Sequence, residues 1–384
     1  MQDSYTTTTT RSYGNRIGSS LKGVLIGLVI IIGAIVLIFI NERNQAQKVR
    51  LMKSVADQVV SIEPAIADEH QNTIIHTSGL VTSENTIEDP SFNFVFDDVL
   101  KYRRTVEMYQ WEETQREETK DKLGGSQEIT VTTTYDKVWS SSPIDSGEFV
   151  RTDYINPTDF PLDSVTQEVA EARINDSLAL SPLLIDRIAG FEAYTPEGDY
   201  VGYTSAGGGT YLYQGNDFTN PEIGDIRIDF KTIPEGTYSF VGEYNNGVIG
   251  EHVGKKQSIG LVAKGSLSAD EMIAQEKAHT RTIGWILRGV ALVMMFVGLS
   301  MLLGPLETLA SVVPMAGRFV GMLSKAITFG IALVLSLMTA SVAWVIYRPV
   351  IGVGLIVVTL AIGFGVRTLA ARNDKKATPE QNNV

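Results

Sequence analysis

The sequence predicts a multi-pass α-helical membrane protein with four spans and a large α+β, mainly β, non-cytosolic domain between spans one and two. The predicted spans are the apolar runs at 21–41, 283–304, 326–346 and 350–366. Each is close to the roughly 20 residues that cross a hydrocarbon core about 30 Å thick. The last three runs are joined by connections too short to wrap a soluble layer around them. We therefore expect these runs to lie in a membrane.

The composition narrows the class of protein. The chain of 384 residues has a formal net charge of -12 and contains no cysteine. Binding to nucleic acid is not expected, because it usually requires a basic patch that neutralises phosphates. The absence of cysteine excludes disulfides, thiolate chemistry and cysteine–zinc sites. Most of the acidic excess lies within 42–282, which indicates an acidic soluble domain in that segment.

The N-terminal segment 1–20 is polar and rich in threonine, so we expect a disordered cytosolic tail. The first span, 21–41, follows it. Its apolar run is longer than the core of a signal peptide and lacks a small-x-small cleavage site, which favours a retained signal anchor. Gly23 and Gly27 have the small-xxx-small spacing that lets helices approach closely, although scattered glycines are common in membrane helices.

The segment 42–282 opens with a predicted juxtamembrane helix, because apolar residues recur at helical spacing as far as Pro64. Runs rich in β-branched residues then predict strands. In the first half we expect strands at 73–81, 102–113 and 128–139, a charged hairpin tip at 117–127, and helices at 162–179 and 183–188. In the second half we expect strands at 200–203, 210–213, 225–231, 237–244, 248–252 and 259–263.

Three local patterns sharpen the second half of the domain. Apolar and charged residues alternate over 226–231, which predicts a half-buried strand. Asn-Asn-Gly at 245–247 predicts a hairpin turn between two strands. Ser268 and Glu271 form a capping box, so a helix is expected to begin there and continue into the second span.

The basic residues predict the topology. After the second span, 305–325 is interpreted as a cytosolic or interfacial segment, and 367–384 as a basic cytosolic tail. The positive-inside rule then places three basic groups on the cytosolic face. These are Arg11, Arg16 and Lys22, then Arg318 and Lys325, and finally Arg367, Arg372, Lys375 and Lys376. Both termini are expected in the cytosol and 42–282 in the periplasm or a lumen, although basic residues at 43–50 weaken this bias.

The sequence offers little chemistry for catalysis, transport or metal binding. The spans hold few ionisable residues: Arg288 lies about one turn into the second span, where it can snorkel, and Arg348 lies in a turn. The histidines lack zinc-binding spacing, the glycines at 207–209 lack the partners of a phosphate-binding loop, and the acidic cluster at 112–121 lacks the calcium-loop pattern. We expect no cofactor, metal or catalytic residue, and a transporter or channel is least favoured.

Several motifs together resemble the transmembrane protein 43 (LUMA) family. The segment 102–114 is similar to that family's Arg-Arg-x-Val-Glu-Met-Tyr-Gln-Trp-x-Glu-Thr signature, and 223–228 to its Val-Gly-Asp-Leu-Arg-Val stretch. The segments 40–42 and 344–349 are also similar. The candidate interaction or signature residues are Arg103, Arg104, Glu107, Tyr109, Trp111, Gly224, Asp225, Arg227, Trp344, Tyr347, Arg348 and Pro349.

The longest motif has a physical reading of its own. A strand over 106–111 places Tyr109 and Trp111 on one face and Val106 and Met108 on the other. The two aromatic residues then either belong to the core of the domain or form an interaction surface near lipid headgroups, where Tyr and Trp are favoured.

The resemblance implies a non-enzymatic scaffold that organises membrane proteins or maintains membrane architecture. Animal members of the family act at the endoplasmic reticulum and inner nuclear membrane, where they self-associate and help to organise proteins such as emerin and lamins. This chain lacks cysteine and has a different polar tail, so a bacterial inner membrane is the alternative location. Expected partners are the lipid bilayer, further copies of the chain and other membrane proteins. An extracytoplasmic stress sensor and a membrane-associated enzyme are the alternative functions.

Overall fold

The computed structural model describes residues 3–122, 124–198, 200–310, 314–350 and 352–354. The chain divides into two compact units. The first, here called the β unit, comprises Met1–Thr10, Arg50–Lys120 and Glu128–Ala278. The second, the helical unit, comprises Arg11–Val49, Asp121–Gln127 and the chain from His279 onward.

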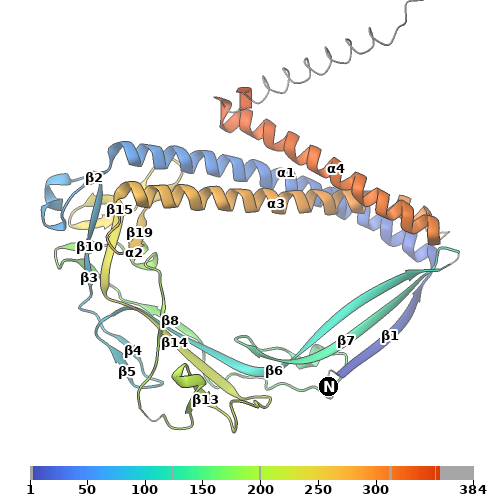
Figure 1. Ribbon diagram of the computed structural model, residues 1–384, viewed down its shortest axis with the longest axis horizontal. Helices are drawn as coiled ribbons and strands as arrows, with labels where there is room; N and C mark the ends of the chain where they lie inside the picture. The colour runs from blue at the N-terminus through green and yellow to red at the C-terminus, as the bar shows by residue number, and fades with distance from the viewer. Residues whose placement is uncertain (1–2, 123, 199, 311–313, 351, 355–384) are drawn as a thin grey trace, which may run out of the picture. The chain divides into compact units, whose positions relative to one another are not determined.

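One sheet of the β unit has eight strands, among them the antiparallel neighbours β6 (Val99–Asp121) and β14 (Ile226–Pro234) (Figure 1). The strand order is β1 (Asp3–Arg11), β7 (Gln127–Ser140), β6, β14, β13 (Tyr211–Gln214) and β12 (Thr204–Ala206), with β11 (Glu192–Tyr194) paired to β14 and β8 (Val165–Glu168) paired to β6. Ile226, Ile228 and Phe230 of β14 are buried, which confirms the predicted half-buried strand.

The other large sheet has seven strands. Their order is β19 (Leu261–Lys264), β15 (Gly236–Asn245), β16 (Val248–Gly250), β10 (Leu178–Leu180), β9 (Arg173–Ile174), β3 (Thr73–Thr82) and β2 (Val60–Ser61), with β15 also paired to β3. Asn246 and Gly247 have φ angles of 48° and 81° between β15 and β16. The predicted hairpin turn is therefore confirmed.

Short elements complete the β unit. They are the two-stranded sheets β4 (Ile87–Asp89) with β5 (Phe94–Phe96) and β17 (His252–Val253) with β18 (Ser258–Ile259), the helix α2 (Pro182–Asp186), and the 3₁₀ helices η1 (Pro64–His70), η2 (Ser146–Glu148) and η3 (Gly207–Gly209). Helix α2 confirms the short helix expected after Pro182.

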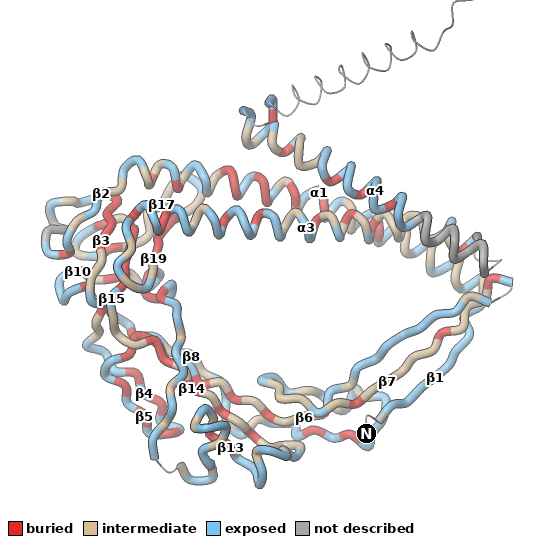
Figure 2. Tube along the Cα trace, in the orientation of Figure 1, coloured by how far each residue is buried: buried red, intermediate tan, exposed pale blue. Residues whose placement is uncertain are grey.

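Inward side chains of both large sheets form the main core, which includes Val106 and Ile228 from one sheet and Ile75 and Phe240 from the other. Burial of apolar side chains of this size, at about 1.5–3 kcal/mol each, is the main source of stability. At the edge of the eight-stranded sheet, by contrast, most side chains are exposed: Figure 2 shows this for residues 4–11 of β1 and for the second half of β6.

Helices enter the β unit at both of its chain ends. Met52 and Val55 near the end of α1 (Tyr13–Gln58) pack with Met272 near the start of α3 (Ala269–Ala310) in a second apolar cluster. The Ser268 N–H donates to Glu271 Oε2 at 2.9 Å, and the Glu271 N–H lies 3.4 Å from Ser268 Oγ. The predicted juxtamembrane helices and capping box are confirmed, but α1 ends at Gln58 and the short strand β2 occupies part of the segment expected to be helical as far as Pro64.

Three helices in the described part of the chain are long and apolar enough to cross a membrane: Tyr13–Gln58, Ala269–Leu309 and Lys325–Tyr347, the last within α4 (Pro314–Tyr347). Helices α1 and α3 lie side by side (Figure 1). A Cβ atom on Gly27 of α1 would lie 2.6 Å from the carbonyl oxygen of Gly298 on α3. The close packing that Gly27 permits is thus made within one chain, between α1 and α3.

The tip of the β6–β7 hairpin belongs to the helical unit. Arg16 Nη1 of α1 donates to the Gly125 carbonyl at 2.7 Å and lies 3.1 Å from Asp121 Oδ1. Gly124 and Gly125 both have positive φ angles, as the predicted tip requires. The turn itself is shorter than predicted, because β6 continues to Asp121.

Two predictions for the described residues are wrong. Residues 3–20 are not a disordered tail: they form β1 and the start of α1, because a threonine-rich strand at a sheet edge needs backbone hydrogen bonds rather than a buried face. Segment 162–179 is not a helix. It contains β8, β9 and the start of β10, and Asn175 and Asp176 turn the chain with φ angles of 46° and 54°. The strand expected at 200–203 lies at Thr204–Ala206, after a bridge between Tyr200 and Tyr203.

The described residues include only part of the C-terminal segments for which predictions were made. The segment expected at the cytosolic face, 305–325, is helical as far as Ala310 and again from Pro314. Helix α4 ends at Tyr347, immediately before the predicted turn. Most of the predicted fourth span, 350–366, and the tail 367–384 lie outside the described residues.

Candidate functional site

The first group of candidate residues lies on the outward face of the eight-stranded sheet, which we call the signature face. It is centred on Arg227 of β14, whose Nε donates to Glu107 Oε2 of β6 at 2.7 Å. The Arg227 guanidinium lies 4.6 Å from the ring centroid of Trp139 and 5.1 Å from that of Tyr211. Contact with the electron-rich faces of two rings fixes this cation in place.

The aromatic residues of the motif extend the signature face along β6. Tyr109 lies 5.0 Å from Trp139 between ring centroids, and Trp111 lies 4.8 Å from Tyr154. Tyr109 and Trp111 are half-buried and lie outside the buried cores, whereas Val106 and Met108 are buried. The predicted alternation is confirmed, and the two aromatics are partly buried, with Trp111 packed against the buried Tyr154.

Arg103 lies on the same outward face, with its guanidinium 4.0 Å from the centroid of Phe191. Arg104 points the other way: it is buried, forms an ion pair with Asp89, and donates to the Asp163 carbonyl at 3.0 Å. Tyr102 donates to the same Asp89 carboxylate at 2.6 Å. Burial and this hydrogen bond raise the pKa of Tyr102. Arg104 is therefore an internal structural charge.

Gly224 and Asp225 hold the turn that brings β14 against β6. Gly224 has a φ of 95°, and its N–H donates to the Tyr109 carbonyl at 2.9 Å, while the Tyr109 N–H donates to the Asp225 carbonyl at 2.8 Å. Tyr213 donates its hydroxyl to the Asp225 carboxylate, and burial together with this bond raises the pKa of Tyr213. These residues position the signature face.

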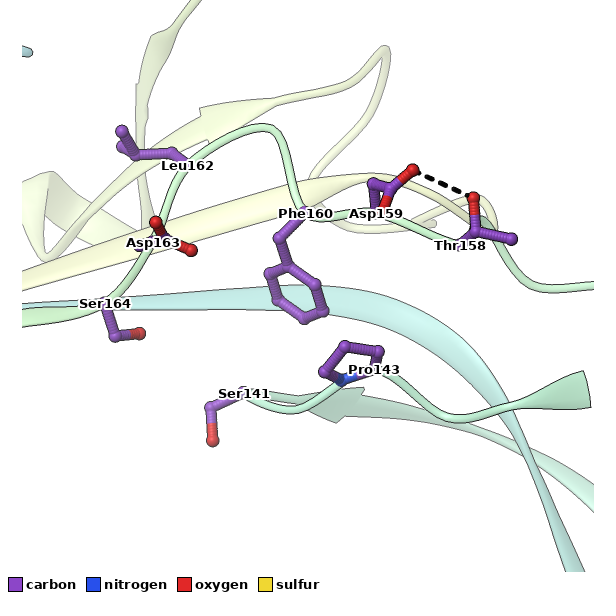
Figure 3. Close-up of a pocket in the computed structure, with 8 residues that line it drawn as sticks. All are labelled: Ser141, Pro143, Thr158, Asp159, Phe160, Leu162, Asp163 and Ser164. Atoms are coloured by element: carbon purple, nitrogen blue, oxygen red, sulfur yellow. Dashed lines mark hydrogen bonds between the residues drawn. The ribbon is translucent and has the colours of Figure 1, made fainter.

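A hollow of about 600 Å³ lies near the start of β8, with Phe160 and Pro143 pointing into it (Figure 3). Its polar lining includes Asp159, which accepts a hydrogen bond from Thr158 at 3.1 Å. The residues lining it are Ser141, Pro143, Thr158, Asp159, Phe160, Leu162, Asp163 and Ser164. None of the twelve candidate residues lines this hollow. Within the described ranges, no group of three or more His, Asp or Glu side chains is arranged to hold a metal ion.

The second group of residues lies in the helical unit, which we call the helix-end cluster. Glu42, immediately after the first apolar run, has a side chain with 0% exposure. Arg288 Nε of α3 donates to Glu42 Oε1 at 2.6 Å. The Arg288 guanidinium also lies 4.7 Å from the ring of Trp285 and 5.8 Å from that of Trp344. The sequence predicted that the Arg288 side chain reaches the membrane interface. Instead, the buried Glu42 carboxylate binds it.

Two neutral amides on α1, next to this ion pair in sequence, connect α3 to the residue that follows α4. Arg348 Nη2 donates to Gln45 Oε1 at 3.2 Å, Gln45 Nε2 donates to Asn41 Oδ1 at 3.2 Å, and Asn41 Nδ2 donates to the Gly284 carbonyl at 3.3 Å. A Cβ atom on Gly284 would lie 1.2 Å from Gln45 Nε2, so any larger residue at this position would displace the Gln45 amide. The network joins three helices at one level.

The remaining candidates of the 344–349 motif flank this network. The Trp344 Nε1 is buried without a hydrogen-bond partner among the described residues. Tyr347 is half-buried and Pro349 is exposed. Sequence reasoning missed Glu42 and Gln45 as site residues. The available signal was a carboxylate directly after one apolar run and an arginine inside another.

The fold and these clusters define a membrane protein in which apolar helices carry a large, mainly β domain. The family model described as Transmembrane protein 43 matches residues 108–349, and the chain belongs to this family.

Comparison with known proteins agrees with this assignment. The chain is 27% identical to Transmembrane protein 43 of Rattus norvegicus over 356 residues, covering 87% of this chain and 86% of that protein. It is 26% identical to the human protein over the same length and coverage. It is also 26% identical to the Drosophila melanogaster homolog over 343 residues, covering 85% of this chain and 89% of the homolog. No solved structure matches the chain.

Proposed function

We propose that this protein is a non-enzymatic membrane scaffold whose β unit binds other membrane proteins through the signature face. The observation that carries the proposal is the arrangement of the signature residues: Glu107, Tyr109 and Trp111 share one outward face with Arg227. Tyr, Trp and Arg are enriched in protein interfaces, where rigid aromatic side chains and planar guanidinium groups contribute most of the binding energy. A ladder of such residues on neighbouring strands suits docking, whereas catalysis requires groups that converge in a pocket.

Photo-crosslinking tests this proposal. A photoreactive residue placed at Tyr109 is expected to form adducts with other membrane proteins or further copies of the chain in native membranes, identified by mass spectrometry. The matched control is Leu80, which is half exposed on the other large sheet and should give few adducts. Recovery of only the monomer from both positions would contradict the scaffold.

We further propose that 42–282 faces the periplasm or a lumen, in a bacterial inner membrane or an endoplasmic reticulum or inner nuclear membrane. The distribution of basic residues supports this orientation. Strand β1 constrains it, because β1 pairs with β7 of the same domain. Two paired strands in water must lie on the same side of a bilayer. If β1 pairs with β7, the N terminus lies on the same side as 42–282. It then cannot lie in the cytosol, separated from 42–282 by a first helix that crosses the membrane.

The absence of cysteine makes this question easy to test. Single cysteines at Ser4 and Ser141, both exposed, can be labelled in sealed vesicles with a membrane-impermeant maleimide. If the cysteines at positions 4 and 141 are labelled from opposite sides of the membrane, the first helix crosses it and β1 does not pair with β7 in the membrane-inserted protein. Labelling from the same side supports the pair and contradicts a cytosolic N terminus.

A further inference from the structure

The apolar helices reach a common level at the helix-end cluster. The first apolar run ends at Ile40, and the next residue, Asn41, donates to the carbonyl of Gly284 at the start of the second run. Gln45, one turn beyond Asn41, accepts from Arg348 immediately after α4. Because apolar runs end where the hydrocarbon ends, this level corresponds to the lipid headgroups.

This level carries an excess of positive charge. The segments 41–48, 284–288 and 347–349 contain a single carboxylate, Glu42. Their cationic side chains are Arg43, Lys48, Arg288 and Arg348. Glu42 is buried and bound by Arg288. The excess positive charge is complementary to anionic lipid headgroups.

The cluster also has the fixed geometry of a binding site. Arg348 is oriented by the neutral amide of Gln45, which Asn41 holds in turn. Trp285 packs against the Arg288 guanidinium and is 62% exposed, so the outer face of its ring is open to lipid. Tryptophan beside arginine at the interface is the combination that holds headgroups, because indole rings favour that layer and guanidinium groups bind phosphate in two-pronged fashion.

We propose that the helix-end cluster binds the phosphate of an anionic phospholipid, with Arg348 as the principal cation and Trp285 packing against the lipid. Glu42, Gln45 and Asn41 are positioning residues, since they orient the guanidinium groups of Arg288 and Arg348. This site is independent of the scaffold function, because it lies in the helical unit and does not involve the signature face.

Native mass spectrometry of the purified full chain tests the proposal. The chain is incubated with mixed phosphatidylcholine and phosphatidylglycerol micelles, and the retained lipids are counted. Phosphatidylglycerol should be enriched on the wild-type chain beyond its share of the mixture. Arg348→Gln, which keeps donors for Gln45 but removes the charge, should reduce the enrichment about fivefold, as expected for one cation at an anionic surface. Arg348→Lys should retain most of it.

Arg281→Gln is the matched control, because Arg281 is exposed about two turns further out on α3. It should leave the enrichment nearly unchanged. Equal losses from Arg348→Gln and Arg281→Gln would show diffuse attraction and overturn the site. A wild-type chain that retains the two lipids in the proportions of the mixture would also overturn it, however the variants fold.

Discussion

Two arginine–glutamate pairs show how differently the two units use charge. In the β unit, Arg227 and Glu107 are 2.7 Å apart across neighbouring strands, and both side chains are 23% exposed. In the helical unit, Arg288 and Glu42 are 2.6 Å apart, and the Glu42 side chain is fully buried. Pairs that water can reach contribute about 0–1 kcal/mol, because water screens their charges. A buried charge that loses its partner destabilises a fold by about 3–5 kcal/mol. The pair in the β unit is therefore available for recognition, and the pair in the helical unit is a structural requirement.

Arg288→Gln should have the largest effect on stability. It leaves the Glu42 carboxylate buried without a cation, so we expect a loss of about 3–5 kcal/mol in unfolding free energy. Thermal or denaturant unfolding in detergent, followed by circular dichroism, measures the loss. The double variant Glu42→Gln with Arg288→Gln should recover most of the stability, because no charge is then left unpaired. A double variant no more stable than the single one would show that Glu42 does not need its partner.

Local sequence patterns predict helices, strands and caps, but they do not predict contacts between residues that are far apart in the chain. The strand over 226–231 and the capping box at Ser268 were predicted correctly, because each depends on residues a few positions apart. The Glu42–Arg288 pair joins residues 246 positions apart, and no local pattern specifies that contact. Arg288 alone suggested a snorkelling side chain; only the packing of α1 against α3 supplies its carboxylate.

The errors at 1–20 and 162–179 have the same origin. Strand β1 forms because the edge of β7 is available to pair with it, which the composition of a threonine-rich tail does not reveal. In 162–179, left-handed backbone at Asn175 and Asp176 makes a strand turn where apolar spacing also fits a helix. The signature face was foreseen as an alternation along β6. Its partners Trp139 and Tyr211 come from neighbouring strands and were not predicted.

The second prediction asks whether the helical unit depends on close packing as well as on charge. In Gly298→Ala, the added Cβ would lie 2.8 Å from the Gly27 carbonyl oxygen and 2.7 Å from Ile31 Cγ1. Overpacking of this kind typically costs about 1–3 kcal/mol. Gly289→Ala is the matched control on the same helix, because its Cβ would meet no atom within 4 Å. If both variants unfold at the same temperature, the α1–α3 contact contributes little to stability.

The third prediction concerns Arg227 and Glu107, whose side chains are partly exposed. Arg227→Gln should lower the unfolding free energy by less than about 1 kcal/mol, because water solvates Glu107 after its partner is lost. The same variant should nevertheless abolish most adducts from the photoreactive residue at Tyr109, since interface arginines are frequent hot spots. Glu107→Gln serves as a companion variant, which retains a hydrogen-bond acceptor for Arg227. A stability loss as large as that of Arg288→Gln would erase the distinction between the two pairs.

The smallest expected effect lies at the capping box where α3 leaves the β unit. Hydrogen bonds from the Ser268 N–H and hydroxyl lower the pKa of Glu271 below its ordinary value of 4.5. The carboxylate therefore stabilises the fold at neutral pH, and this contribution is lost as the pH falls from 4.5 through the lowered pKa. Glu271→Gln should remove this part of the acid sensitivity of the unfolding midpoint, and Ser268→Ala should remove less, because the backbone donor remains. An acid-dependent midpoint that is the same in Glu271→Gln and wild type would show that the box contributes no pH-dependent stability.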